Sequence, residues 1–201
     1  MTDAQRGPEP EALVACLPTG AGLVFRHYGH PHRYQLAARV LDQCRKQGVF
    51  CLIAGDIRLA LALGADGVHL PERMMQGSLA GLQTFRRRGG WPTAAAHSRA
   101  AALSAVRLGV DGLFVSPLFS TPSHPAAKGL GILRFRQIIR DLQCPVFALG
   151  GITADTLNRV AGAGVYGVAG ISLFATAEIH EDSRKTGEIT IKEGVVRKGA
   201  D

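Results

Sequence analysis

Long apolar segments and clustered charge are both missing from this chain. No hydrophobic stretch free of charged residues reaches the roughly 18 residues that a membrane-spanning helix needs, and the N-terminal sequence MTDAQRGPEPEA lacks the apolar core of a signal peptide. Lysine and arginine outnumber aspartate and glutamate by 23 to 16, but the longest basic run is Arg86, Arg87 and Arg88, which does not favour nucleic-acid binding. We expect a cytoplasmic protein that binds neither a membrane nor nucleic acid.

The cysteine pairs typical of zinc sites are also missing. The 4 cysteines include no CxxC spacing, and Cys51 and Cys144 lie in apolar, strand-like runs, which predicts buried, reduced thiols. Three histidines fall within residues 25–33, FRHYGHPHR, but a glycine and a proline between them break any helix or strand that could bring them together. We expect solvated loop histidines there rather than a metal site.

Apolar, strand-like runs alternate with longer amphipathic segments along the chain. Segments such as 33–48 and 99–109 have helical spacing. Seven runs have the composition of strands: 21–27, 49–55, 66–70, 92–97, 111–117, 145–151 and 166–172. No GxGxxG turn opens the chain to indicate a dinucleotide fold. The alternation therefore predicts an α/β fold, a (β/α)8 TIM barrel formed by residues 1–175 as one domain.

One connection occurs three times in nearly the same form. ALALGADGVHL, AVRLGVDGLFV and RVAGAGVYGVAG each run from a helix through a glycine into a strand. Glycine just past a helix end adopts the left-handed conformation at low cost. The three copies predict tight turns from helix to strand.

The strand count leaves one position of an eight-stranded barrel without a candidate. Nothing before Glu11 resembles a strand, so either the first strand is missing or an unusual segment replaces it. An unpaired edge invites covering, and a homodimer is one expectation. Residues 176–201 carry two short β-prone pieces, EITI and GVVRK, which predict either a small hairpin or a disordered tail.

Several motifs in fixed order resemble those of the thiamine phosphate synthase and TenI-like family. They are LIAGDIRLALALGADGVHL, the pair His97-Ser98, VSPLFSTPSHP, PVFALGGI and GVAGIS, within Gly22 to Phe174. The resemblance implies a (β/α)8 barrel and a role in thiamine biosynthesis. The synthase joins hydroxymethylpyrimidine diphosphate to thiazole phosphate and releases pyrophosphate, with Mg²⁺ as cofactor. TenI-like relatives instead aromatise the thiazole by tautomerisation, or have no assigned chemistry.

On the diphosphate side, the resemblance assigns catalytic roles to two residues. Arg26 matches the arginine of the family's QLRxK motif, and Asp56 matches the aspartate of its Asn-Asp-Arg motif, a metal ligand. Tyr28 replaces the lysine of QLRxK, and residues 71–74 read Pro-Glu-Arg-Met where the family has Gly-Gln-Glu-Asp. Magnesium sites usually use one or two carboxylates together with substrate phosphates. We expect Mg²⁺ to bind weakly if Asp56 is its one protein ligand.

On the thiazole-phosphate side, the loop STPSHP resembles the family's PTxTKP. The resemblance makes Thr121 and Ser123 phosphate ligands, while His124 stands where lysine is usual and nearby Lys128 is a candidate for the missing charge. A phosphorylated small molecule, either thiazole phosphate or thiamine phosphate, is therefore the expected ligand.

Backbone amides complete this predicted phosphate site. Gly150 and Gly151 allow a ligand oxygen to approach the amides at the end of PVFALGG. In GVAGIS, Ile171 and Ser172 lie where the last strand ends, so their amides can point at the same phosphate. Taken alone, GGIT is also explained by a tight strand-helix turn with Thr153 or Asp155 near the helix cap.

Two functions from different classes stay open at this point. One is the synthase; the other is a TenI-like barrel that binds a phosphorylated thiazole or thiamine phosphate, for regulation or tautomerisation. Relatives with tautomerase activity carry a histidine after the sixth strand, where this chain has Ser116-Pro117. His97 is a candidate acid-base group or a hydrogen-bonded structural histidine, and His69 is expected to be structural.

Overall fold

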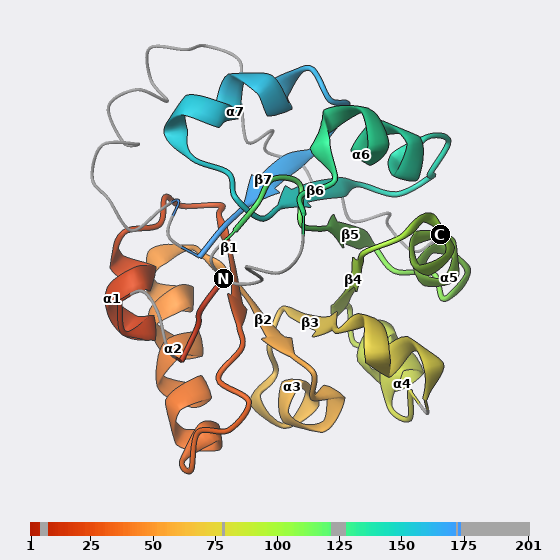
Figure 1. Cartoon of the computed structure of the whole chain (residues 1–201). Helices are drawn as coiled ribbons and strands as arrows, with labels where there is room; N and C mark the ends of the chain where they lie inside the picture. Colours follow the sequence, from red (N-terminus) through yellow and green to blue (C-terminus); the bar gives the residue numbers. More distant parts are fainter. Residues whose placement is uncertain (5–7, 78, 122–127, 172, 174–201) are drawn as a thin grey trace.

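The computed structural model describes residues 1–4, 8–77, 79–121, 128–171 and 173, and contains one curled, all-parallel sheet (Figure 1). Its strands are β1 (Gly22–Phe25), β2 (Phe50–Ala54), β3 (Gly67–Leu70), β4 (Trp91–Ala96), β5 (Gly112–Val115), β6 (Val146–Leu149) and β7 (Gly167–Ala169). Each strand pairs with the next one in the chain, so the spatial order equals the sequence order. All seven predicted strands are confirmed.

Helices cover the outer face of the sheet (Figure 1). They are α1 (Pro10–Ala15), α2 (Arg33–Gln47), α3 (Ile57–Leu63), the 3-10 helix η1 (Glu72–Gln76), α4 (Leu82–Arg87), α5 (Arg99–Arg107), α6 (Gly131–Ile139) and α7 (Ala154–Ala161). None of the helices in the described part of the chain is long and apolar enough to cross a membrane.

Side chains alternate between two cores along β1, β2, β5, β6 and β7, as the pleat of a strand requires. Leu23 and Phe25 of β1 belong to the large core between the sheet and the helices. Val24, between them, belongs to a smaller cluster with Leu52, Ala54, Phe114 and Met1. Burial on both faces explains why the strands read as continuous apolar runs rather than alternating ones.

The repeated helix-to-strand turns form as predicted. Gly64 caps α3 with φ 61°, and Gly109 and Gly164 have φ 71° and 79°. All three lie in the left-handed region that glycine adopts without strain.

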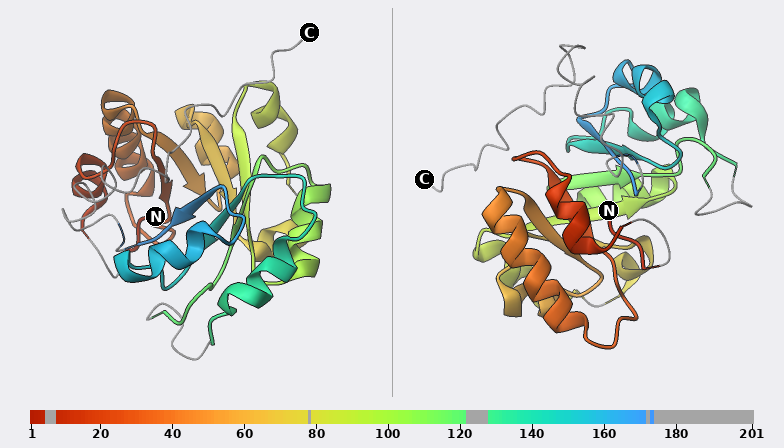
Figure 2. Two further views of the ribbon diagram at one scale, coloured as in Figure 1. Left: turned by 90° about the horizontal axis from the view of Figure 1, so that it is seen from above. Right: turned by 90° about the vertical axis from the view of Figure 1, so that its left-hand side faces the viewer.

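The N-terminal segment bridges the two edges of the sheet, β1 and β7. The Met1 nitrogen donates to Gly170 O at 2.8 Å, and the Thr2 amide donates to Val24 O at 2.9 Å. Figures 1 and 2 show this end of the chain beside both strands. In the described residues before Gly22 there is a helix but no strand, which confirms that another segment takes the first strand's place. These contacts weaken the reason for expecting a homodimer, since the edges are not bare.

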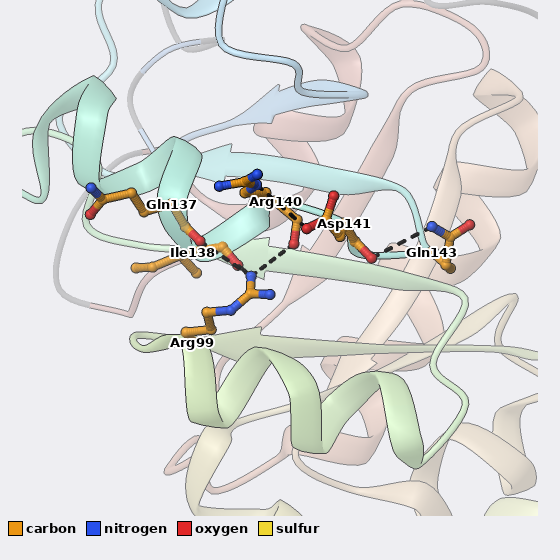
Figure 3. A network of polar contacts seen from close by, with 6 residues as sticks. All are labelled: Arg99, Gln137, Ile138, Arg140, Asp141 and Gln143. Carbon is orange, nitrogen blue, oxygen red and sulfur yellow. Dashed lines mark hydrogen bonds and ion pairs between the residues drawn. The ribbon is translucent and has the colours of Figure 1, made fainter.

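One arginine joins two neighbouring helices. Arg99, at the start of α5, donates from Nη1 to the carbonyl oxygens of Gln137, Ile138 and Arg140 at 3.2, 2.9 and 2.8 Å (Figure 3). Carbonyls at a helix end have no partner within the helix. Arg99 therefore donates hydrogen bonds to carbonyl oxygens at the end of α6 and links α6 to α5.

The cysteine prediction is confirmed for Cys51, which is buried, whereas Cys144 is only partly buried. A hydrogen bond with the Cys44 thiol, together with burial, raises the pKa of Cys51. Cys51 therefore stays a protonated thiol.

The expectation of solvated histidines is wrong for His27. Its side chain is buried, stacks on the Phe25 ring and lies 3.0 Å from Thr2 Oγ1 through Nδ1, and burial lowers its pKa. The partner comes from the start of the chain, which local sequence could not indicate. His30 is partly buried and His32 exposed. Within the described residues, no group of three or more His, Cys, Asp or Glu side chains could hold a metal ion.

The predicted tail, residues 176–201, lies outside the described residues. The choice between a hairpin and disorder stays a prediction.

Candidate active site

The carboxyl ends of all seven strands open onto one end of the sheet, because the strands are parallel. We call this end the mouth. Arg26 directly follows β1, His97 follows β4, and Ile171 lies two residues beyond β7. The fold therefore brings residues from both ends of the chain to one place, as the sequence predicts.

The loop after β5 lies directly on the end of β6. The Leu118 amide donates to Leu149 O at 2.9 Å, and the Phe119 amide donates to Gly150 O at 3.0 Å. These two bonds fix the start of the loop that carries Thr121.

Gly150 and Gly151 form the surface on which this loop packs. Their φ angles are 97° and 64°. A Cβ atom added at Gly150 would lie 2.9 Å from Pro117 Cα, and one added at Gly151 would lie 2.4 Å from Ser120 O. A side chain at either position would clash with the backbone of the loop after β5. This clash, and not the approach of a ligand, explains why both residues are glycine. Whether their amides bind phosphate stays a prediction.

The remaining predicted phosphate ligands fall into two groups. Thr121 and Ile171 are partly buried and Lys128 is exposed, with Ile171 packed against the inner cluster. Ser123, His124 and Ser172 lie outside the described residues. Thr153 caps α7 in a capping box with Thr156, which confirms the local explanation of GGIT.

Arg26 lies at the mouth, near the inner face of the sheet. Its side chain is 32% exposed and its guanidinium is 4.0 Å from the Asp3 carboxylate. Its charge reaches His69: burial, then Arg26, lowers the pKa of His69 to about 3. A partly exposed guanidinium at a strand end is suited to contact an anionic ligand.

His69 is structural, as the sequence predicts. It is buried, its Nδ1 lies 3.0 Å from Thr93 Oγ1, and its ring meets the edge of Phe114 at 5.0 Å between centroids. A pKa of about 3 keeps the imidazole neutral at pH 7.

Asp56 has a structural role that the sequence does not reveal. Its Oδ1 accepts from the Leu59 amide at 2.9 Å and caps α3, and its Oδ2 accepts from Arg33 Nη1 at 3.2 Å. Arg33 also donates to Ala54 O at 2.7 Å. No motif points to Arg33, because it lies at the start of the preceding helix and reaches the mouth only in the folded chain.

His97 is held by hydrogen bonds from its backbone amide and from its ring, whose Nδ1 also lies 3.2 Å from Ser116 Oγ. Its amide donates to Glu72 Oε2 at 2.8 Å, and its Nδ1 donates to Ser116 O at 2.8 Å. A proton on Nδ1 leaves Nε2 as an acceptor in the neutral ring. Because His97 is exposed as well as hydrogen-bonded, both of its predicted roles stay open. Its neighbour Ser98 caps α5.

The carboxylates at the mouth do not make a magnesium site. Both Asp56 oxygens already accept hydrogen bonds, and one Glu72 oxygen is bound by the His97 amide. Residues 71–74 supply no second free carboxylate beside them. This donor set does not fit a magnesium ion held by protein carboxylates.

Comparisons with known proteins identify the family of this chain. The sequence model described as thiamine monophosphate synthase matches residues 2–174. A putative thiamine-phosphate synthase 2 of Aquifex aeolicus is 37% identical over 141 residues, which cover 70% of this chain and 74% of the relative. A thiamine-phosphate synthase of Chloroflexus aurantiacus is 33% identical over 185 residues, covering 89% and 84%.

A solved structure supports the same assignment. Thiamine phosphate pyrophosphorylase from Pyrococcus furiosus superposes with a TM-score of 0.73 at 26% sequence identity, covering 90% of this chain and 88% of that one. With the family match over nearly all of the described fold, the conclusion is direct: the chain belongs to the thiamine monophosphate synthase family.

Proposed function

We propose that this chain joins hydroxymethylpyrimidine diphosphate to thiazole phosphate and releases pyrophosphate, as a thiamine-phosphate synthase. One observation carries the proposal. Arg26, which matches the family's strand-end arginine, lies at the same mouth as the loop that β6 holds through Leu149 O and Gly150 O. Groups suited to the two substrates therefore surround one end of the sheet.

The chemistry assigns a separate task to each side of the mouth. The thiazole nitrogen forms a bond to the pyrimidine methylene carbon, the C–O bond to the diphosphate breaks, and its electron pair leaves with pyrophosphate. Negative charge grows on the departing group, and a fixed cation placed there stabilises the transition state. Arg26 is the residue to which we assign this task.

The thiazole phosphate belongs on the other side. We assign its oxygens to the hydroxyls of Thr121 and Ser123 and to the amides of Gly150, Gly151, Ile171 and Ser172, with His124 or Lys128 near enough in sequence to add charge. Hydroxyls and backbone amides at strand ends suit a phosphate. The family resemblance also implies Mg²⁺, which would neutralise the diphosphate, but the donor set described above does not fit it, and no step is assigned to the ion.

The TenI-like alternative has less support. Tautomerisation needs an acid-base group near neutral pH, and the loop after β5 offers Ser116 and Pro117 instead of a histidine. His97 is the remaining candidate at the mouth. The relatives described above carry synthase names, which favours the condensation.

Replacing Arg26 by glutamine should lower kcat/KM for the pyrimidine diphosphate by about 10- to 100-fold, the scale of one lost hydrogen bond to a charged group. Steady-state assays of thiamine phosphate formation measure this. Arg39→Gln is the matched control, because Arg39 also pairs with an acidic residue of the N-terminal segment, Glu11, at 3.1 Å. An equal loss in both variants would place the reaction elsewhere.

A further inference from the structure

Tyr28 lies at the centre of a cluster formed by the ends of β1, β2 and β3. Its ring rests on Gly55: a Cβ atom added there would lie 2.9 Å from Tyr28 Cε1 and 3.8 Å from Met74 Sδ. The guanidinium carbons of Arg33 and Arg73 each lie 5.7 Å from the centroid of this ring. We call these residues the Tyr28 cluster: Tyr28, Arg33, Gly55, Arg73 and Met74.

The two arginines of the cluster differ in how their charge is balanced. Arg33 is 15% exposed and is paired with Asp56. Arg73 is exposed, and among the described residues no carboxylate lies within ion-pair distance of it, its recorded contact being the Tyr28 ring. Its neighbour Glu72 is bound through Oε2 to the His97 amide instead. Arg73 is thus the arginine of the cluster whose charge is available to a ligand.

The residues of the Tyr28 cluster include no carboxylate, the group with which proteins usually hold a divalent cation. Both oxygens of Asp56 are engaged, and Met74, whose thioether is a poor magnesium ligand, lies over Gly55. A guanidinium presents several N–H donors in one plane, which match the oxygens of a phosphate, and it keeps its charge at any physiological pH. An arginine can therefore bind a diphosphate group without the help of a metal ion.

We propose that Arg73, seated on Tyr28, supplies the positive charge for a diphosphate group at this mouth, so that the chain binds diphosphate without a divalent cation. The inference rests on the proposed function for the identity of the anion. Tyr28 positions the guanidinium: an arginine over an aromatic ring retains its in-plane N–H donors for the ligand.

Calorimetric titration with inorganic pyrophosphate in EDTA tests this directly. The unmodified chain should bind pyrophosphate, and adding Mg²⁺ should change the affinity by less than about 3-fold. Arg73→Gln should weaken binding by about 10-fold or more, and Arg73→Lys by less, because lysine keeps the charge but not the planar donors. Arg107→Gln, an exposed arginine at the end of α5, should bind as the unmodified chain does.

Binding that requires Mg²⁺, or unchanged binding by a folded Arg73→Gln variant in EDTA, would overturn the inference. Tyr28→Phe should bind normally and Tyr28→Leu more weakly; equal affinities would remove the positioning role of the ring. The test is separate from that of the function. Metal-dependent synthesis would leave the synthase proposal standing, whereas Arg73-dependent binding in EDTA without synthesis would leave this inference standing.

Discussion

Gly151→Ala should lower the free energy of unfolding by about 3 kcal/mol, measured by urea denaturation. A residue other than glycine at φ 64° costs roughly 1–2 kcal/mol. The added Cβ would also lie 2.4 Å from Ser120 O and 2.8 Å from Phe119 Cβ, so the loop after β5 must move, at a further cost on the order of 1–3 kcal/mol. Because that loop carries Thr121, the variant should also lose affinity for thiazole phosphate.

Two other glycines separate the cost of backbone strain from the cost of the clash with the loop. Gly164 has φ 79° but nothing within 4 Å of an added Cβ, and Gly162 has ordinary φ and equally open space. Gly164→Ala should therefore cost about 1 kcal/mol from backbone strain alone, and Gly162→Ala close to nothing. If Gly151→Ala is no more destabilising than Gly164→Ala, the packing of the loop on Gly151 is not as described.

Stability should fall as the pH is lowered from about 6.5 towards 3, in part because of His69. Its pKa is about 3 in the folded chain and about 6.5 when unfolded, so the unfolded chain binds the proton more readily over this range. The contribution of neutral His69 to the free energy of unfolding is fully present above about pH 6.5. At pH 5 about 2 kcal/mol of it should be lost, at about 1.4 kcal/mol for each pH unit below the unfolded pKa.

The variant His69→Asn isolates this contribution. Asparagine can still donate to Thr93 Oγ1 but does not titrate. The difference in free energy of unfolding between pH 7 and pH 5 should be smaller by about 2 kcal/mol in the variant than in the unmodified chain. His27, whose pKa burial also lowers, is present in both proteins and cancels. The same pH dependence in both would show that His69 is not buried in its neutral form.

Local sequence was sufficient for the strands, the helices and the glycine turns, because each depends on a few neighbouring residues. Six of the seven strands lie within their predicted ranges and β4 begins one residue earlier, at Trp91, while Gly64, Gly109 and Gly164 take the left-handed conformation. The packing surface at Gly151 was not predictable from GGIT alone, since the atoms that require glycine belong to Ser120 and Phe119.

Contacts between distant segments account for what the sequence could not indicate. His27 contacts Thr2, from the start of the chain, and Oδ2 of Asp56 accepts from Arg33, from the preceding helix. Neither pairing follows a helical or strand period. The sequence therefore predicts Asp56 as a metal ligand, whereas the fold gives both of its oxygens other partners.

The central claim is that the mouth carries out the condensation, and phosphorus-31 NMR of one reaction mixture tests it most directly. The chain is incubated with hydroxymethylpyrimidine diphosphate and thiazole phosphate, with and without Mg²⁺. The account predicts that the signals of the organic diphosphate are replaced by free pyrophosphate while thiamine phosphate forms in equal amount. Unchanged spectra in both mixtures, from a folded chain that binds thiazole phosphate, would contradict the claim and favour a binding protein.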